Sequence, residues 1–172
     1  MIMKQELAKP IVAVLTGDKE LLSDVIALLE KHFGSCDYKG SWHSFTQSDY
    51  YEEEMGKDLK RCIISFENLK PAYTADEFKG WAEEVEKQFT SDEKRRVNID
   101  PGYVDNLKTV LVSGKCGGHK ICSSPGVFVD YILWYNKGWQ PFPWSFPDFK
   151  DGTYDEDLVN IRRIFKEQAA LA

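Results

Sequence analysis

The most informative stretch of the chain is Arg95-Arg96-Val97-Asn98-Ile99-Asp100-Pro101-Gly102-Tyr103-Val104-Asp105. We interpret its first half as a β-strand, because alternate side chains of a strand point to opposite faces of a sheet. Val97 and Ile99 then face one side. The polar residues on the other side are Arg96, Asn98 and Asp100. We expect Pro101-Gly102 to end the strand in a tight turn, since proline cannot donate to a ladder and glycine permits the turn. The pattern predicts a polar site on one face of a rigid element.

The residues before this stretch alternate between strand and helix patterns. Apolar runs and alternating residues predict strands at 10–16, 38–45, 61–66 and 95–100. Apolar residues at helical spacing predict amphipathic helices at 18–33 and 74–89. Asp18 is expected to cap the first helix and Gly34 to close it, and Thr74 with Glu77 forms a capping box for the second. The order β-α-β-β-α-β predicts a ferredoxin-like core over residues 10–105.

The residues after this stretch extend the core. Two antiparallel strands are predicted at 107–113 and 127–135, joined by a glycine-rich segment at 114–126. A proline-rich and aromatic segment follows, and Asp155 is expected to cap a final helix. We therefore expect an α+β fold in a single domain, residues 1–172, with this extension in 106–172. Helices on one face would leave the other face of the sheet open to a ligand.

Length and charge narrow the function classes. A chain of 172 residues buries about 70% of its unfolded surface, enough for a sizeable core. A net charge of −6 argues against binding to nucleic acid backbones or to anionic membranes. The longest apolar run near the N-terminus covers only 11–15, too short for a signal peptide or a membrane span, so we expect a cytoplasmic protein. Its four cysteines are then expected to be reduced thiols.

Two further segments carry candidate ligand-binding residues. The glycine-rich segment contains Lys115, His119 and Lys120, which suit an anion, although a plain hairpin loop has the same composition. Three residues there, Cys116, His119 and Cys122, are one ligand short of a structural zinc site, so we assign no metal site.

Asp130 lies inside the apolar strand 127–135 and must find a partner or raise its pKa. It can serve as a general base, as a metal ligand or as half of a structural ion pair.

Two surface segments remain open to two interpretations each. Residues 50–56 contain two tyrosines and three consecutive glutamates, which usually mark a solvated face. If this segment folds over the open sheet face, Glu54 can meet Arg96 or a metal ion. Residues 139–149 place aromatic side chains between prolines, which suits stacking on a flat ligand or covering a sheet edge.

Taken together and in this order, these motifs resemble a bacterial family known as domain of unknown function 4416. The segments that carry the resemblance are Tyr50 to Gly56, Arg96 to Tyr103, Lys115 with His119-Lys120, Gly126 to Leu133, and Trp144 to Phe149. The chain departs from the family pattern at Lys120, Asp130 and Gly114, where the family usually has arginine, glutamate and threonine. The resemblance implies a small soluble bacterial protein. Some relatives are labelled as GTP-binding, but this chain has no Walker A lysine.

The leading functional hypothesis is a site for a small anionic ligand, phosphorylated or a nucleotide, on the open sheet face. The residues assigned to ligand binding are Arg96, Asn98, Asp100, Tyr103, Lys115, Lys120 and Tyr51. The residues assigned to catalysis are Asp130, His119 and Glu54, with Mg²⁺ as a candidate cofactor for phosphoester chemistry. The alternative is a non-catalytic module for protein interaction or metabolite sensing.

Overall fold

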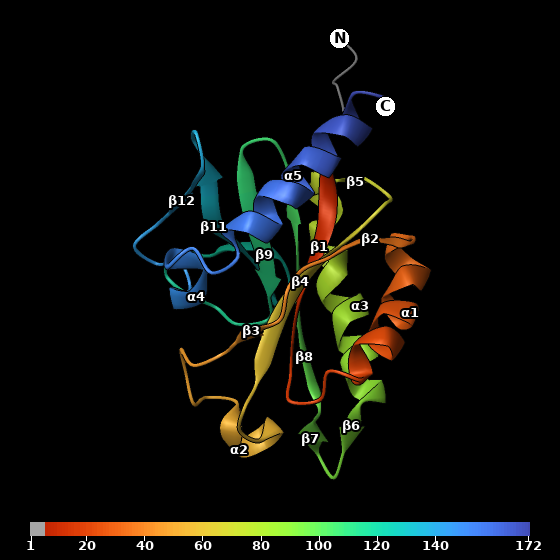
Figure 1. Ribbon diagram of the computed structural model, residues 1–172, viewed down its shortest axis with the longest axis vertical. Helices are drawn as coiled ribbons and strands as arrows, with labels where there is room; N and C mark the ends of the chain where they lie inside the picture. The colour runs from red at the N-terminus through yellow and green to blue at the C-terminus, as the bar shows by residue number, and fades with distance from the viewer. Residues whose placement is uncertain (1–5) are drawn as a thin grey trace.

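A computed structural model describes residues 6–172. The long strands are β1 (Leu7–Thr16), β2 (Cys36–Lys39), β4 (Lys60–Phe66), β8 (Val97–Val104), β9 (Lys108–Ser113), β10 (Ile121–Ser124) and β11 (Val127–Tyr135). They form an antiparallel sheet in the order β10-β11-β9-β8-β1-β4-β2 (Figure 1). Three short strands complete its ten strands: β3 (His43–Ser44), β5 (Lys70–Pro71) and β12 (Trp139–Pro141). A separate hairpin joins β6 (Thr90–Ser91) to β7 (Lys94–Arg95).

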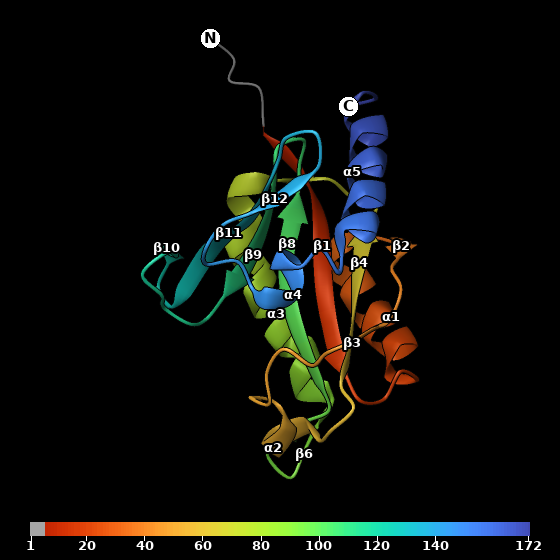
Figure 2. The same ribbon diagram turned by 60° about the vertical axis from the view of Figure 1, so that its left-hand side comes forward.

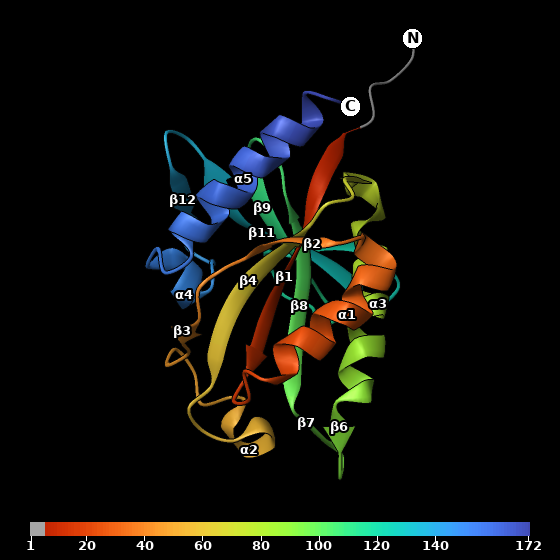
Figure 3. The ribbon, with the colours of Figure 1, turned by 45° about the vertical axis from the view of Figure 1, so that its right-hand side comes forward.

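Helices cover both faces of the sheet. On one face lie α1 (Leu21–Phe33) and α3 (Ala75–Gln88), side by side in Figure 3, with the short 3₁₀ helix η1 (Ala72–Thr74) before α3. On the other face lie α4 (Pro147–Lys150) and α5 (Asp155–Ala169), which Figure 2 shows opposite α1 and α3. One more short helix, α2 (Glu52–Met55), lies beyond the end of the sheet (Figure 1). Among residues 6–172, none of these helices is long and apolar enough to cross a membrane.

The sheet is buried on both faces along β1. Val12 and Val14 belong to the core under α1 and α3, and Ile11 and Ala13 belong to a second core under α4 and α5. The helices at 18–33 and 74–89 predicted that the second face of the sheet would be open. This prediction is wrong along β1. The reason is that the C-terminal helices bring apolar side chains such as Leu158 onto that face.

The strand containing Asn98 does not end at Pro101-Gly102. β8 continues to Val104 and pairs with β1 along its whole length, but it pairs with β9 only over residues 102–104. A Cβ atom on Gly102 would collide with the carbonyl oxygen of Val110 and lie 2.9 Å from Cα of Leu111. The glycine is therefore needed for close approach of β9 rather than for a turn. Since residues 97–101 of β8 have no partner on the β9 side, the two strands separate there.

The helices lie close to the predicted ranges, but the N-terminal caps expected from Asp18, Thr74 and Asp155 make no side-chain cap hydrogen bond. Gly34 ends α1 with a φ of 81°, as expected. The capping box is wrong, because the Thr74 hydroxyl donates to the carbonyl oxygen of Pro71 and makes no cap hydrogen bond. Asp18 lies two residues before the N-cap Glu20 and accepts the backbone N–H of that residue. The predicted strand 38–45 is divided into β2 and β3, which both pair with β4.

Candidate functional site

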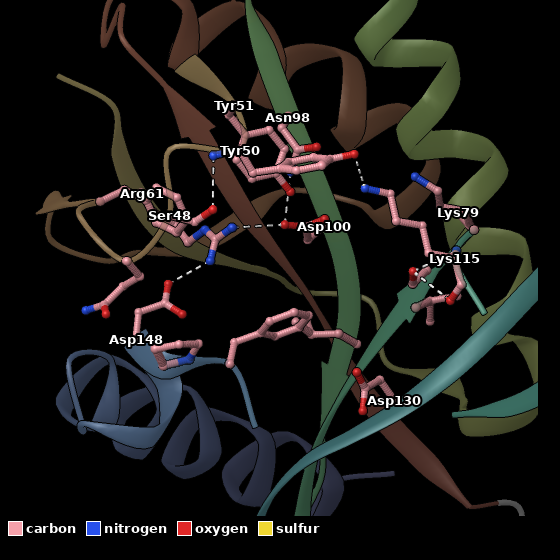
Figure 4. Close-up of a pocket in the computed structure, with 18 of the residues that line it drawn as sticks. Ser48, Tyr50, Tyr51, Arg61, Lys79, Asn98, Asp100, Lys115, Asp130 and Asp148 are labelled. Carbon is pink, nitrogen blue, oxygen red and sulfur yellow. Dashed lines mark hydrogen bonds and ion pairs between the residues drawn. The ribbon is translucent and has the colours of Figure 1, made fainter. Parts of the chain in front are cut away.

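A pocket of about 460 Å³ lies where β8 and β9 separate (Figure 4). Its walls come from β4, β8, β9, β11, α3, the glycine-rich segment and the residues around α4. The cationic residues that line it are Arg61, Lys79, Arg95, Lys115 and Lys120. The carboxylates are Glu83, Asp100, Asp130 and Asp148. Both predicted polar residues of β8, Asn98 and Asp100, are part of this wall.

One side of the pocket is a buried ion-pair network around Arg61. The Arg61 guanidinium donates from Nη1 to Oδ2 of Asp148 at 2.7 Å and from Nη2 to Oδ2 of Asp100 at 3.3 Å (Figure 4). Asn98 donates to the same oxygen of Asp100 at 3.0 Å. Sequence analysis missed Arg61 and Asp148, although an arginine that begins an apolar strand is a signal of a buried partner. The network holds Asp100 in place with its charge already balanced.

Arg95, rather than Arg96, provides the cation next to Asn98. Its Nη1 donates to Oδ1 of Asn98 at 2.9 Å, and its Nε and Nη2 donate to the two carboxylate oxygens of Glu54 at 2.7 and 2.9 Å. The hydrogen bond from Arg95 lowers the pKa of Glu54. Arg96 instead donates to Asp18 at 2.8 Å and lines a second hollow of about 390 Å³. The prediction that Arg96 shares a face with Asn98 is wrong, because the regular strand alternation begins only at Val97.

Residues 45–56, which we call the covering segment, pack against the pocket. The Tyr51 ring contacts the rings of Phe45 and Tyr50, and burial raises the pKa of Tyr51 to about 12. The Tyr50 hydroxyl lies 2.6 Å from Nζ of Lys115 (Figure 4). Together with the Glu54 contact to Arg95, these interactions fix the segment over the site. Glu54 therefore meets an arginine, but this arginine is Arg95 and not the expected Arg96.

The glycine-rich segment places two lysines at the pocket. Nζ of Lys120 lies 3.3 Å from the Ser113 hydroxyl and from the Lys115 carbonyl oxygen, and 3.9 Å from Oδ2 of Asp130. Nζ of Lys115 contacts the hydroxyl and the ring face of Tyr50. Among residues 6–172, Lys115 forms no ion pair with a carboxylate.

Asp130 on β11 is buried at the pocket wall with little compensation. Its side chain is 2% exposed, and neither carboxylate oxygen accepts a hydrogen bond from any residue that the structure describes. Nε2 of His119 approaches Oδ2 to 3.4 Å, an ion-pair distance without hydrogen-bond geometry. Burial raises the pKa of Asp130 in spite of His119 and Lys120. His119 itself stacks on Trp144 and does not line the pocket.

Tyr103, which was assigned to ligand binding, lies outside the pocket. Tyr103 has the same strand parity as Val97 and Ile99, so its ring is buried in the core under α1 and α3. Burial raises its pKa. Within residues 6–172, no group of three or more His, Cys, Asp or Glu side chains is placed to hold a metal ion.

The aromatic segment at 139–149 both covers an edge and reaches the site. β12 pairs with β11, and Phe146 and Pro147 line the pocket. Trp144 stacks on Phe142 with 4.7 Å between ring centroids. All four cysteines are free, two of them exposed in the glycine-rich segment.

Comparison with known proteins gives one match. The family model described as a domain of unknown function (DUF4416) matches residues 6–165. A search of curated proteins and a search of solved structures found no match. Since the matched residues cover nearly the whole chain and include every pocket residue, the chain belongs to the DUF4416 family.

Proposed function

We propose that the pocket between β8 and β9 binds a small phosphorylated compound, and that Lys115 and Lys120 contact its phosphate. The observation that carries this proposal is how weakly the two ammonium groups are paired with carboxylates. Lys115 has no carboxylate partner among the described residues. Lys120 is close to two neutral oxygens and 3.9 Å from its nearest carboxylate. Two ammonium groups that line one pocket suit a dianion, since lysine binds phosphate as a point charge.

The remaining pocket cations, Lys79, Arg61 and Arg95, each lie closer to a carboxylate than Lys120 does. Arg61 is bound to Asp148 and Asp100, and Arg95 is bound to Glu54. A ligand that displaced either arginine from its partner would leave a carboxylate unpaired, which is costly in a buried site. The two lysines are therefore the cations best placed to bind a ligand anion.

The proposal is one of binding, and it assigns no reaction. Both carboxylate oxygens of Glu54 accept hydrogen bonds from Arg95, which lowers the pKa of Glu54 and makes it a weaker base. We infer that residues 10–105 follow the ferredoxin-like arrangement, which is supported by the strand order β8-β1-β4-β2 and by α1 and α3 on one face.

Thermal unfolding with added ligands tests the proposal. The probes are inorganic phosphate, ribose 5-phosphate, glucose 6-phosphate and AMP, each titrated to 10 mM. A ligand present at about 100 times its Kd adds about 2.7 kcal/mol of stability, which raises Tm by roughly 5–10 °C for a chain of this length. We expect at least one phosphorylated organic compound to give such a rise.

Two variants locate the binding site. Lys115→Met is expected to weaken binding at least tenfold. Lys166→Met, an exposed lysine on α5, is the matched control and is expected to bind like the wild type. If no phosphorylated probe raises Tm, or if Lys115→Met binds as tightly as the control, the proposal is wrong.

A further inference from the structure

We propose that Asp130 accepts a hydrogen bond from a hydroxyl group of the ligand, so that the pocket selects sugar or polyol phosphates over phosphates that lack hydroxyl groups. This inference rests on the proposed function, because it concerns the same pocket. Lys115 and Lys120 would hold the phosphate, and Asp130 would recognise the carbon skeleton that carries it.

Neither carboxylate oxygen of Asp130 has a hydrogen-bond donor within residues 6–172. The side chain is 2% exposed, it lines the pocket, and both oxygens are without a hydrogen bond from the described residues. A carboxylate that is taken out of water normally recovers its lost hydrogen bonds within the protein. Here the acceptor positions are unused, and a donor on a bound ligand would fill them.

A purely structural ion pair explains the position of Asp130 less well. Nε2 of His119 approaches Oδ2 to 3.4 Å, and Nζ of Lys120, at 3.9 Å from the same oxygen, balances part of its charge. Neither contact has the geometry of a hydrogen bond, and neither reaches Oδ1. A carboxylate kept only for stability would be expected to accept hydrogen bonds, as Asp148 does from Arg61 and Tyr154.

The surroundings of Asp130 favour a neutral donor. An ammonium group on the ligand would come close to Lys120, and like charges at short range repel each other. A hydroxyl group donates one hydrogen bond without adding charge. A phosphate that carries hydroxyl groups therefore satisfies both the lysines and Asp130.

Binding of two matched ligands tests this inference. Glycerol 3-phosphate and propyl phosphate have the same number of carbon atoms and the same phosphate, but only the first carries hydroxyl groups. Leaving one buried acceptor unpaired is expected to weaken binding about ten- to a hundredfold. We expect isothermal titration calorimetry at pH 7 to show glycerol 3-phosphate binding at least tenfold more tightly than propyl phosphate. Ribose 5-phosphate and glucose 6-phosphate serve as larger members of the same class.

Variants assign the preference to Asp130. In Asp130→Ala the two ligands are expected to bind equally, with propyl phosphate bound at least as tightly as by the wild type. Asp130→Asn keeps one acceptor oxygen and the shape of the side chain, so it is expected to keep part of the preference and to fold normally. Circular dichroism of both variants checks the fold.

The outcomes separate this inference from the proposed function. If both phosphates bind equally to the wild type and the binding depends on Lys115, the site binds phosphates and the role of Asp130 is wrong. If the preference persists in Asp130→Ala, another residue recognises the hydroxyl group, and the inference is again wrong. If none of these phosphates binds and inorganic phosphate and AMP also fail to bind, the proposed function and this inference both fail.

Discussion

Replacing Asp148 by alanine tests whether the buried network around Arg61 holds the C-terminal segment against the sheet. The side chains of Arg61 and Asp148 are 6% and 4% exposed. Oδ2 of Asp148 accepts from Nη1 of Arg61 at 2.7 Å and from the Tyr154 hydroxyl at 2.7 Å. The substitution therefore removes the closest partner of a buried guanidinium and leaves a buried hydroxyl without its acceptor.

The expected loss of stability follows from this geometry. Removing one partner of a buried ion pair costs about 3–5 kcal/mol, because the other charge stays buried without compensation. Asp100 remains 3.3 Å from Nη2 of Arg61 and offsets part of the loss. We therefore expect the free energy of unfolding to fall by about 3 kcal/mol, at the lower end of that range. For a chain of this length, that corresponds to a decrease in Tm of roughly 6–12 °C.

Urea unfolding followed by tryptophan fluorescence measures the effect. The midpoint should fall while the dependence on urea concentration stays the same, since the fold is unchanged. Tyr154→Phe is the matched control, because it removes one hydrogen bond to Asp148 and keeps the ion pair with Arg61. Its expected cost is about 1.5 kcal/mol. If Asp148→Ala costs no more than Tyr154→Phe, the buried ion pair does not carry the stability assigned to it.

Two further substitutions test the close approach of β9 to Gly102 and the buried carboxylate of Asp130. Gly102→Ala should lower the free energy of unfolding by at least about 1–3 kcal/mol, because the new Cβ collides with the backbone of Val110. Gly118→Ala, where a Cβ meets no atom within 4 Å, is the control, and equal urea midpoints for the two variants would contradict the reasoning. Burial raises the pKa of Asp130 above its ordinary value of 3.8, so the folded state binds more protons than the unfolded state just above that pH. Asp130 therefore lowers the free energy of unfolding as pH rises. The free energy of unfolding of Asp130→Asn, relative to that of the wild type, should increase between pH 3.5 and pH 7. A difference that stays constant across that range in urea unfolding would show that the folded protein does not raise the pKa of Asp130.

The amino-acid sequence alone determined the elements with strong local patterns. The apolar run of β1, the two amphipathic helices and Gly34 at the end of α1 were all predicted correctly. So was the alternation that separates Val97 and Ile99 from Asn98 and Asp100. These features depend on side-chain periodicity and backbone conformation over a few residues, which any sequence displays directly.

Only the folded chain revealed how distant residues meet. Pro101-Gly102 has the composition of a turn. The contact that requires glycine at position 102 comes from Val110 on another strand, and the local sequence does not indicate it. Arg61 and Asp148 are 87 residues apart, and nothing near either residue names the other.

The pocket itself exists because β9 leaves β8 after three paired residues, and the covering segment and the glycine-rich segment then meet at the opening. Strand separation and charge pairing depend on long-range packing, and local sequence patterns carry no information about which distant backbone or charge will be the neighbour.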